Sequence, residues 1–220
     1  YQQFNDYNQA LMNSGADIVY LSLPNSMHFP WSKKILKLGY HLIVDKPITT
    51  KVGELNQLIR IAKRKKLLLT EATFFNYHNQ FGFVKKFIGK PSNIEQVFVN
   101  FTIPMPKKNS LLLSQKFNGG TFMDMSPYTA SINRILFEER PKKKSIIVKK
   151  NIQKLIISYD VFLKYKTKVF IGTFKFGKKY NNKILIFLRN RSIEINRAFS
   201  PPSNKTLEIQ ITKKSKAQKV

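Results

Sequence analysis

The sequence contains no cysteine, which excludes disulfide bonds and thiolate chemistry. No apolar run approaches the roughly 20 residues that a membrane-spanning helix needs. The first residues show neither the basic start nor the apolar core of a secretory signal. We therefore expect a cytoplasmic location and no membrane partner.

Histidine is also scarce, and the few present are spaced unlike metal ligands. His28, His41 and His78 are far apart in the sequence, and no cysteine is available to complete a site. We therefore expect a protein without a bound metal.

Acidic residues are few: 12 Asp and Glu stand against 39 Lys and Arg, for a formal net charge of +27. Such a charge is typical of proteins that bind polyanions. The cations are spread over the whole length, however, and the densest run, at 63–66, falls in the last turn of an expected helix, where it complements the helix dipole. We expect a lysine-rich surface with no dedicated nucleic-acid partner, and keep a basic polyanion-binding protein as an alternative.

The most regular stretch, from Asp17 to Pro47, predicts a strand, a helix and a second strand. The first strand, DIVYLSL, is a run of β-branched and apolar residues between Gly15 and Pro24, typical of a strand buried on both faces. The helix is expected to end at Gly39, and HLIVDKP repeats the strand. Because ligands bind outside the carboxyl ends of parallel strands, the PNSMH and DKP loops are expected to face one site.

The remainder of the chain changes character after a third strand. The pattern predicts a helix capped by Thr49 or Thr50, a strand at 67–72 and a helix at 77–88. From residue 93 onward, alternating stretches predict strands, interrupted by one helix at 121–137. We expect an α/β domain at 1–72, the C-terminal half of a Rossmann-type parallel sheet. A mostly antiparallel, open-sheet α+β domain should follow at 73–220 and end in a basic tail.

The glycine-rich turn G-x-G-x-x-G that opens a dinucleotide-binding domain is also missing. In such a domain this turn places the pyrophosphate at a helix N-terminus. The strand pattern here instead begins at Asp17, as the fourth strand of such a sheet would. We expect the chain to be a fragment of a longer domain, and the alternative is that the first half of the domain is supplied elsewhere.

Three loops in a fixed order carry a resemblance to a known family. P-N-S-M-H at 24–28, G-Y-H-L-I-V-D-K-P at 39–47 and L-L-L-T-E-A at 67–72 resemble, in order and spacing, segments of the Gfo/Idh/MocA oxidoreductases, named after glucose-fructose oxidoreductase and inositol dehydrogenase. The stretch from Asn118 to Phe137 is similar to the G-G-x-x-x-D-x-x-x-H helix of that family, with tyrosine where histidine is usual. The resemblance implies an enzyme that uses NAD or NADP.

The resemblance implies that Lys46 is the catalytic lysine, whose ammonium hydrogen-bonds the substrate oxygen while hydride moves to or from the cofactor. Tyr128 would supply the proton, and Asp124 would belong to the same catalytic set. The residues alone leave other interpretations open. Lys46 could form a loop ion pair, and Tyr128 could pack against Phe122. Pro127 could also begin the helix, which would take Asp124 off the face of Tyr128.

For the cofactor, the resemblance implies contacts from the loops that follow the strands, namely Pro24, Asn25, His28, Asp45, Lys46 and Glu71. On the residues alone, His28 could instead cap a helix. The expected substrate contacts are His78 and Gln80. Asn76 and Asn79 depart from the family, which commonly has arginine and then proline there.

The segment 176–202 resembles the closing segment of relatives that act on nucleotide-linked deoxysugars. We therefore expect hydride transfer between a nicotinamide cofactor and a carbonyl or hydroxyl group of a sugar or sugar nucleotide. The alternative, motivated by the missing glycine turn, is an inactive or truncated remnant of the family. The resemblance also implies a homo-oligomer formed through the C-terminal sheet.

Overall fold

The computed structural model describes residues 2–202 and 207–213 of the chain. The chain divides into two compact units. Unit 1 comprises residues 1–73 and the short segment 116–119, and unit 2 comprises residues 74–115 and 120–220. The expected basic tail lies, from residue 214 onward, outside the described residues. Within those residues, no helix is both long and apolar enough to span a membrane.

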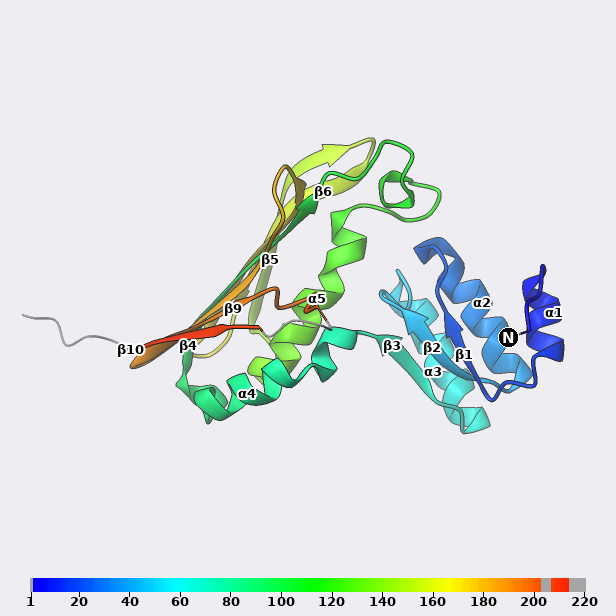
Figure 1. The fold of residues 1–220 in the computed structure, drawn as a ribbon, viewed down its shortest axis with the longest axis horizontal. Coiled ribbons are helices and arrows are strands. Elements are labelled where there is room, and N and C mark those ends of the chain that lie inside the picture. Colours follow the sequence, from blue (N-terminus) through cyan, green and yellow to red (C-terminus); the bar gives the residue numbers. More distant parts are fainter. Residues whose placement is uncertain (1, 203–206, 214–220) are drawn as a thin grey trace, which may run out of the picture. The chain divides into compact units, whose positions relative to one another are not determined.

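Unit 1 contains a parallel sheet with the strand order β1-β2-β3 (Figure 1). Its elements are α1 (Tyr7–Asn13), β1 (Ile18–Leu21), α2 (Asn25–Leu38), β2 (His41–Asp45), α3 (Val52–Lys65) and β3 (Leu69–Ala72). Leu21 pairs with Val44, and Asp45 pairs with Ala72. The three strands therefore end at one edge of the sheet, and the loops that follow them begin there.

The core of unit 1 lies between the sheet and helices α2 and α3. Leu36, Leu42, Val44 and Leu58 are fully buried in it. The first strand differs from the expectation of burial on both faces. Among the described strands β1 pairs with β2 alone, and its Ile18 and Tyr20 are 45% and 51% exposed.

The helix ends in unit 1 show which capping signals operate. Gly39 ends α2 in the left-handed conformation (φ 103°), as predicted. α1 begins only at Tyr7, because the Asp6 carboxylate accepts the N–H groups of Asn8 and Gln9. The expected caps of α3 are wrong: that helix follows Lys51 without a side-chain cap from the described residues, and the Thr49 hydroxyl donates to the Lys51 carbonyl.

Unit 2 is built on a seven-stranded, mostly antiparallel sheet with the order β10-β9-β8-β4-β7-β6-β5. Its strands are β4 (Ile94–Pro104), β5 (Lys143–Ile152), β6 (Leu155–Lys164), β7 (Val169–Gly177), β8 (Asn181–Leu188), β9 (Arg191–Asn196) and β10 (Ile209–Lys213). β4 runs parallel to β7. The expected fold class, a parallel sheet followed by a mostly antiparallel one, is confirmed.

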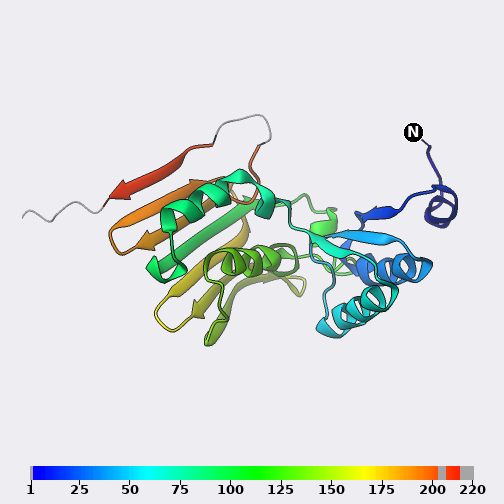
Figure 2. The same cartoon turned by 90° about the horizontal axis from the view of Figure 1, so that it is seen from below.

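The helices of unit 2, α4 (Asn79–Ile88) and α5 (Thr121–Leu136), lie on the same side of the sheet (Figures 1 and 2). Short 3-10 turns are found at Phe74–Tyr77, Pro91–Asn93 and Leu111–Leu113. Strand residues alternate between a buried face and a partly exposed face, as in β8, where Ile184 and Ile186 are fully buried and Phe187 is exposed. The helices therefore cover one face of the sheet with a hydrophobic core between.

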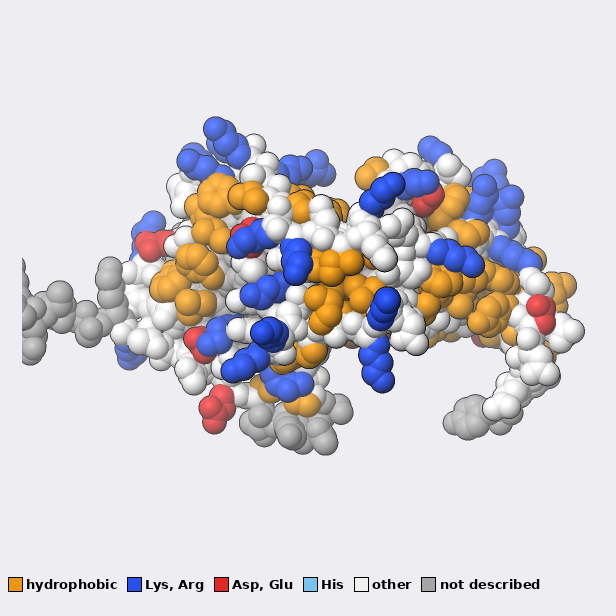
Figure 3. Space-filling view, turned by 90° about the horizontal axis from the view of Figure 1, so that it is seen from above, with side chains coloured by type: hydrophobic (Ala, Val, Ile, Leu, Met, Phe, Trp, Pro, Cys, Tyr) orange, Lys and Arg blue, Asp and Glu red, His pale blue; other side chains and the backbone are white. Residues whose placement is uncertain are grey.

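The positive charge is not gathered into one patch on the face shown in Figure 3. Lys and Arg side chains lie apart there, with apolar and uncharged side chains between them. Some of the cations are paired: the ammonium of Lys183 lies 2.7 Å from the Glu194 carboxylate, and that of Lys149 lies 3.1 Å from Asp160.

The centre of β7 depends on a glycine. Phe170, Gly172 and Phe174 share the buried face of this strand, and both phenylalanines are fully buried. A Cβ atom on Gly172 would lie 2.6 Å from a ring carbon of Phe174 and 3.0 Å from one of Phe170. The two rings therefore occupy the space that a side chain at residue 172 would need.

We predict that Gly172→Ala lowers the free energy of unfolding by about 1–3 kcal/mol, because the added methyl group overpacks the core. Gly82→Ala is the matched control in unit 2. Gly82 is exposed in α4, and no described atom lies within 4 Å of an added Cβ. This control should be neutral or more stable by up to ~1 kcal/mol, since alanine favours helix. Urea unfolding measures both, and an unchanged midpoint for Gly172→Ala would contradict the close packing.

Candidate active site

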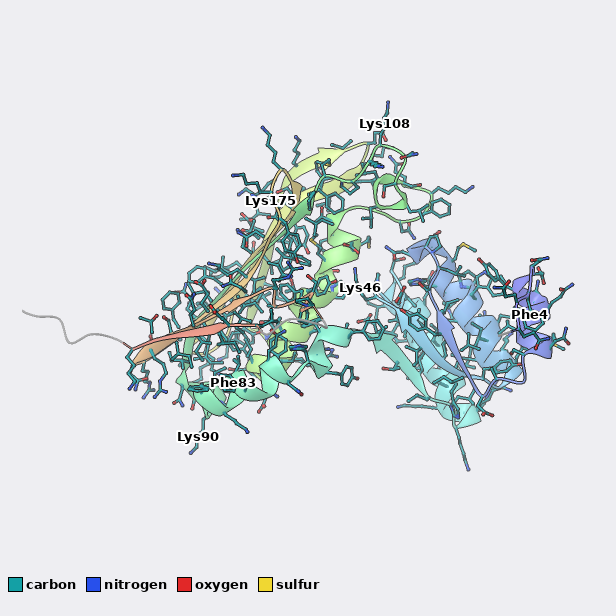
Figure 4. The ribbon with its side chains drawn as sticks, in the orientation of Figure 1. Phe4, Lys46, Phe83, Lys90, Lys108 and Lys175 are labelled. Atoms are coloured by element: carbon teal, nitrogen blue, oxygen red, sulfur yellow. The ribbon has the colours of Figure 1, made fainter. Side chains whose placement is uncertain are left out.

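The candidate site of unit 1 is formed where the three parallel strands end. Lys46 directly follows β2, is half-buried, and is marked in Figure 4. The other residues of the candidate site follow β1 or lie at the ends of β2 and β3. We call this group the strand-end site and define it as Pro24, Asn25, Asp45, Lys46 and Glu71.

Asp45 is held by two hydroxyl groups from the neighbouring strand segment. The Tyr20 hydroxyl donates to one oxygen of its carboxylate, and the Ser22 hydroxyl donates to the other at 2.7 Å. The hydrogen bond to Asp45 raises the pKa of Tyr20 to about 12, so Tyr20 stays a donor at neutral pH. The sequence alone did not single out these two hydroxyls, because the pairing of β1 with β2 decides which side chains face Asp45.

His28 joins the two loops that begin at the ends of β1 and β2. Its side chain is fully buried, with Nδ1 at 2.7 Å from the Pro47 carbonyl oxygen and Nε2 at 2.6 Å from the Leu23 carbonyl oxygen. Both ring nitrogens therefore face backbone carbonyl oxygens of unit 1, and the ring donates to one of them when neutral and to both when protonated. The structure gives His28 a part in holding the loop that carries Lys46, whereas a direct contact with the cofactor stays a prediction.

The other strand-end residues are oriented by the backbone. The side-chain amide of Asn25 donates to the carbonyl of Asn118, in the segment 116–119 of unit 1, at 2.9 Å. One oxygen of Glu71 accepts the N–H of Ile48 at 2.9 Å. Pro24 is the N-cap residue of α2, which begins without a side-chain cap from any described residue. Its first amide N–H groups thus point toward the same edge of the sheet.

In unit 2, α5 carries both residues expected to act there. The helix begins after Gly120 and continues through Pro127, so Pro127 does not start it. Asp124 lies in the first turn, and its N–H donates to the Gly120 carbonyl at 3.1 Å. Because Asp124 and Tyr128 are four residues apart in one helix, they lie on the same face.

The ring of Tyr128 is fixed by three aromatic neighbours. Its centroid lies 5.4 Å from that of Phe75, 5.1 Å from Phe101 and 4.9 Å from Phe199. The expected alternative partner, Phe122, packs instead on Tyr159 at 5.2 Å. Strands and turns far away in the sequence supply the real partners, which is why the local sequence did not reveal them.

His78 and Gln80 lie at the start of α4. His78 is the N-cap residue, and its Nδ1 accepts the N–H of Gln80 at 3.2 Å. Gln80 is 5% exposed, and its amide nitrogen donates to the Ala198 carbonyl at 2.8 Å. Its side-chain oxygen is buried without a hydrogen-bond partner in residues 2–202 and 207–213. Both residues thus hold the helix start in place, and their contact with a substrate remains a prediction.

Within the part of the chain that the structure describes, no group of three His, Cys, Asp or Glu side chains could hold a metal ion.

Comparison with known proteins adds the family. A family model described as an oxidoreductase family with an NAD-binding Rossmann fold, Gfo/Idh/MocA, matches residues 1–73. A dTDP-3,4-didehydro-2,6-dideoxy-alpha-D-glucose 3-reductase from Streptomyces antibioticus is 25% identical over 210 residues, which cover 92% of this chain and 63% of the relative. The reductase of the same name from Streptomyces violaceoruber is 26% identical over 132 residues, 59% of this chain and 39% of the relative. The chain thus spans less than two thirds of the length of these relatives.

Solved structures share the fold of the whole chain. KijD10, a 3-ketoreductase from Actinomadura kijaniata in complex with NADP and TDP-benzene, superposes with a TM-score of 0.89 at 22% identity, covering 98% of this chain and 67% of that chain. An aldose-aldose oxidoreductase from Caulobacter crescentus gives a TM-score of 0.83 at 16% identity, over 97% and 68% of the two chains. The resemblance predicted from the three loops is therefore confirmed: residues 1–73 match the model of the Gfo/Idh/MocA oxidoreductases with its NAD-binding Rossmann fold, and the fold of the chain is that of these solved structures.

Proposed function

We propose that the protein is an NAD- or NADP-dependent oxidoreductase that transfers hydride between the cofactor and a carbonyl or hydroxyl group of a sugar nucleotide. The observation that carries this proposal is the position of Lys46, at the end of a parallel strand, on a loop that the buried His28 holds. The named relatives, which act on dTDP-linked deoxysugars, support the choice of a sugar nucleotide.

The polar groups of the strand-end site fit the nicotinamide end of such a cofactor. An ammonium, a side-chain amide and two carboxylates stand at the ends of three adjacent strands, beside an uncapped helix start within the described residues. Asn25, Asp45 and Glu71 would hold the cofactor with hydrogen bonds to its ribose and carboxamide, and the ring of Pro24 would pack against it. When bound, the cofactor supplies or accepts the hydride.

Lys46 would act on the substrate oxygen. Its ammonium donates a hydrogen bond to that oxygen and stabilises the negative charge that develops as a carbonyl is reduced. Tyr128 would act as the proton donor in reduction and as the proton acceptor in oxidation. Asp124, one turn earlier on the same helix face, would accept hydrogen bonds from sugar hydroxyl groups. His28 would act as a positioning residue through the loop that carries Lys46.

The structures of KijD10 offer independent support for this pair. They include variants in which a lysine is replaced by alanine or glutamate and one in which a tyrosine is replaced by phenylalanine. The lysine and the tyrosine replaced in KijD10 are separated by nearly the same number of residues as Lys46 and Tyr128 in this chain.

One observation favours the inactive-remnant alternative: Asn76 and Asn79 stand where the family commonly has arginine and then proline. Binding of NADH or NADPH by this chain at micromolar concentration, followed by nicotinamide fluorescence, would count against a remnant. The cytoplasmic location expected from the sequence stays a prediction.

We also propose that the face of the unit 2 sheet opposite α4 and α5 forms a homo-oligomer. Phe98 and Phe187 lie on this face with ring centroids 5.8 Å apart, and Phe187 is 37% exposed. Partly exposed apolar side chains on a broad sheet face are suited to pack against the same face of a second copy of the chain.

We predict that Lys46→Ala lowers kcat more than tenfold, because the charge on the substrate oxygen loses its stabilising ammonium. The control is Lys63→Ala, which removes an equal charge from the exposed last turn of α3 in the same unit. Steady-state turnover and the melting temperature are measured for both. Near-normal turnover of Lys46→Ala would remove this residue from the mechanism.

We predict that Tyr128→Phe lowers kcat by about 10²–10⁴-fold, as expected for loss of a general acid or base. The phenylalanine ring keeps the packing against Phe75, Phe101 and Phe199, so the melting temperature should stay unchanged. Tyr7→Phe in α1 serves as the control. A variant that turns over at the wild-type rate would leave Tyr128 a packing residue.

We predict that Phe187→Glu converts the oligomer to a monomer, because a carboxylate would have to be buried in the interface without a partner. Size-exclusion chromatography with light scattering measures the mass in solution. Lys150→Glu, on the exposed strand β5, is the control and should keep the oligomer. An unchanged mass for Phe187→Glu would place the interface elsewhere.

A further inference from the structure

A cavity of about 450 Å³ lies in unit 2, between the second half of α5, the turn that follows it and the end of β6. Its volume is within the range of roughly 300–1,000 Å³ that ligand pockets occupy. Neither Asp124 nor Tyr128 lines it. The proposed oxidoreductase mechanism therefore makes no use of this cavity.

The inner wall of the cavity is a fixed hydrogen-bonded structure. Tyr165 is 1% exposed, and its hydroxyl donates to the side-chain oxygen of Asn133 at 2.5 Å. The nitrogen of Asn133 donates to the Thr129 carbonyl at 2.7 Å. The ring of Tyr165 packs on Phe137 with centroids 4.4 Å apart. A ligand would thus meet a preformed surface, which lowers the entropy cost of binding.

The charge at the cavity is positive once internal pairing is considered. The ammonium of Lys168, with its side chain 8% exposed, lies 2.7 Å from the Glu139 carboxylate and neutralises it. Burial, helped by the charge of Glu139, raises the pKa of Tyr165 to about 12 and keeps its hydroxyl protonated.

Three cations then face one remaining carboxylate among the lining residues. Arg134, Arg140 and Lys144 line the cavity with exposed side chains, and Glu138 is the carboxylate. The Thr129 hydroxyl lies buried in the wall and has no hydrogen-bond partner among the described residues.

We propose that this cavity binds a small organic molecule with an apolar body and a single carboxylate at one end. Ala130, Pro141 and Leu163 supply the apolar walls for the body. The carboxylate lies toward Arg134 and Arg140, whose guanidinium groups match its geometry. The site is separate from the strand-end site and does not depend on the proposed oxidoreductase function.

Calorimetric titration of the chain with octanoate tests the proposal, with 1-octanol and octylamine as the neutral and cationic homologues. Octanoate is expected to bind saturably with one site per chain, and each homologue at least tenfold more weakly. Saturable binding absent up to millimolar octanoate, or octylamine binding as tightly as octanoate, would overturn the proposal.

Two variants place the binding in the cavity. Ala130→Phe fills it from an exposed helix position, and the double change Arg134→Gln with Arg140→Gln removes the cations. Each should weaken octanoate binding at least tenfold, whereas Lys150→Gln on β5 should leave it unchanged. Melting temperatures confirm that the variants are folded. Wild-type affinity in both cavity variants would show that octanoate binds elsewhere.

Discussion

The buried imidazole of His28 is the contact on which the strand-end site depends. It reaches the Leu23 and Pro47 carbonyls, one in each of the two loops that leave the parallel sheet. A buried polar group left without its partner costs about 1–3 kcal/mol, so a loop whose carbonyl accepts from the ring cannot move away at low cost. The position of Lys46, one residue before Pro47, therefore follows from a side chain that does not itself belong to the strand-end site.

In unit 2, aromatic packing holds the proposed acid–base residue in place. Tyr128 projects from α5 into a set of rings contributed by the 3-10 turn after β3, by β4 and by the segment after β9. Aromatic packing restricts the ring and leaves the chemistry to the hydroxyl. In both units, buried groups that take no part in the proposed chemistry orient the ones that do.

The sequence predicted the parallel and antiparallel sheets, the end of α2 at Gly39 and the loops after the strands, because these follow from local periodicity and glycine conformation. The sequence did not predict the features that depend on contacts between segments far apart in the chain. The aromatic partners of Tyr128 come from segments that are remote from it in the sequence. The hydroxyls that hold Asp45 come from a neighbouring strand, and motif spacing along one chain does not reveal them.

The central claim is that His28 acts by placing Lys46, and a double-mutant cycle on turnover tests it most directly. If His28 works through the Lys46 loop, His28→Ala slows the enzyme, yet adding it to Lys46→Ala causes no further loss once the folded fraction is corrected for. Rate losses that multiply in the double variant would contradict the claim, because His28 would then contribute independently of the lysine.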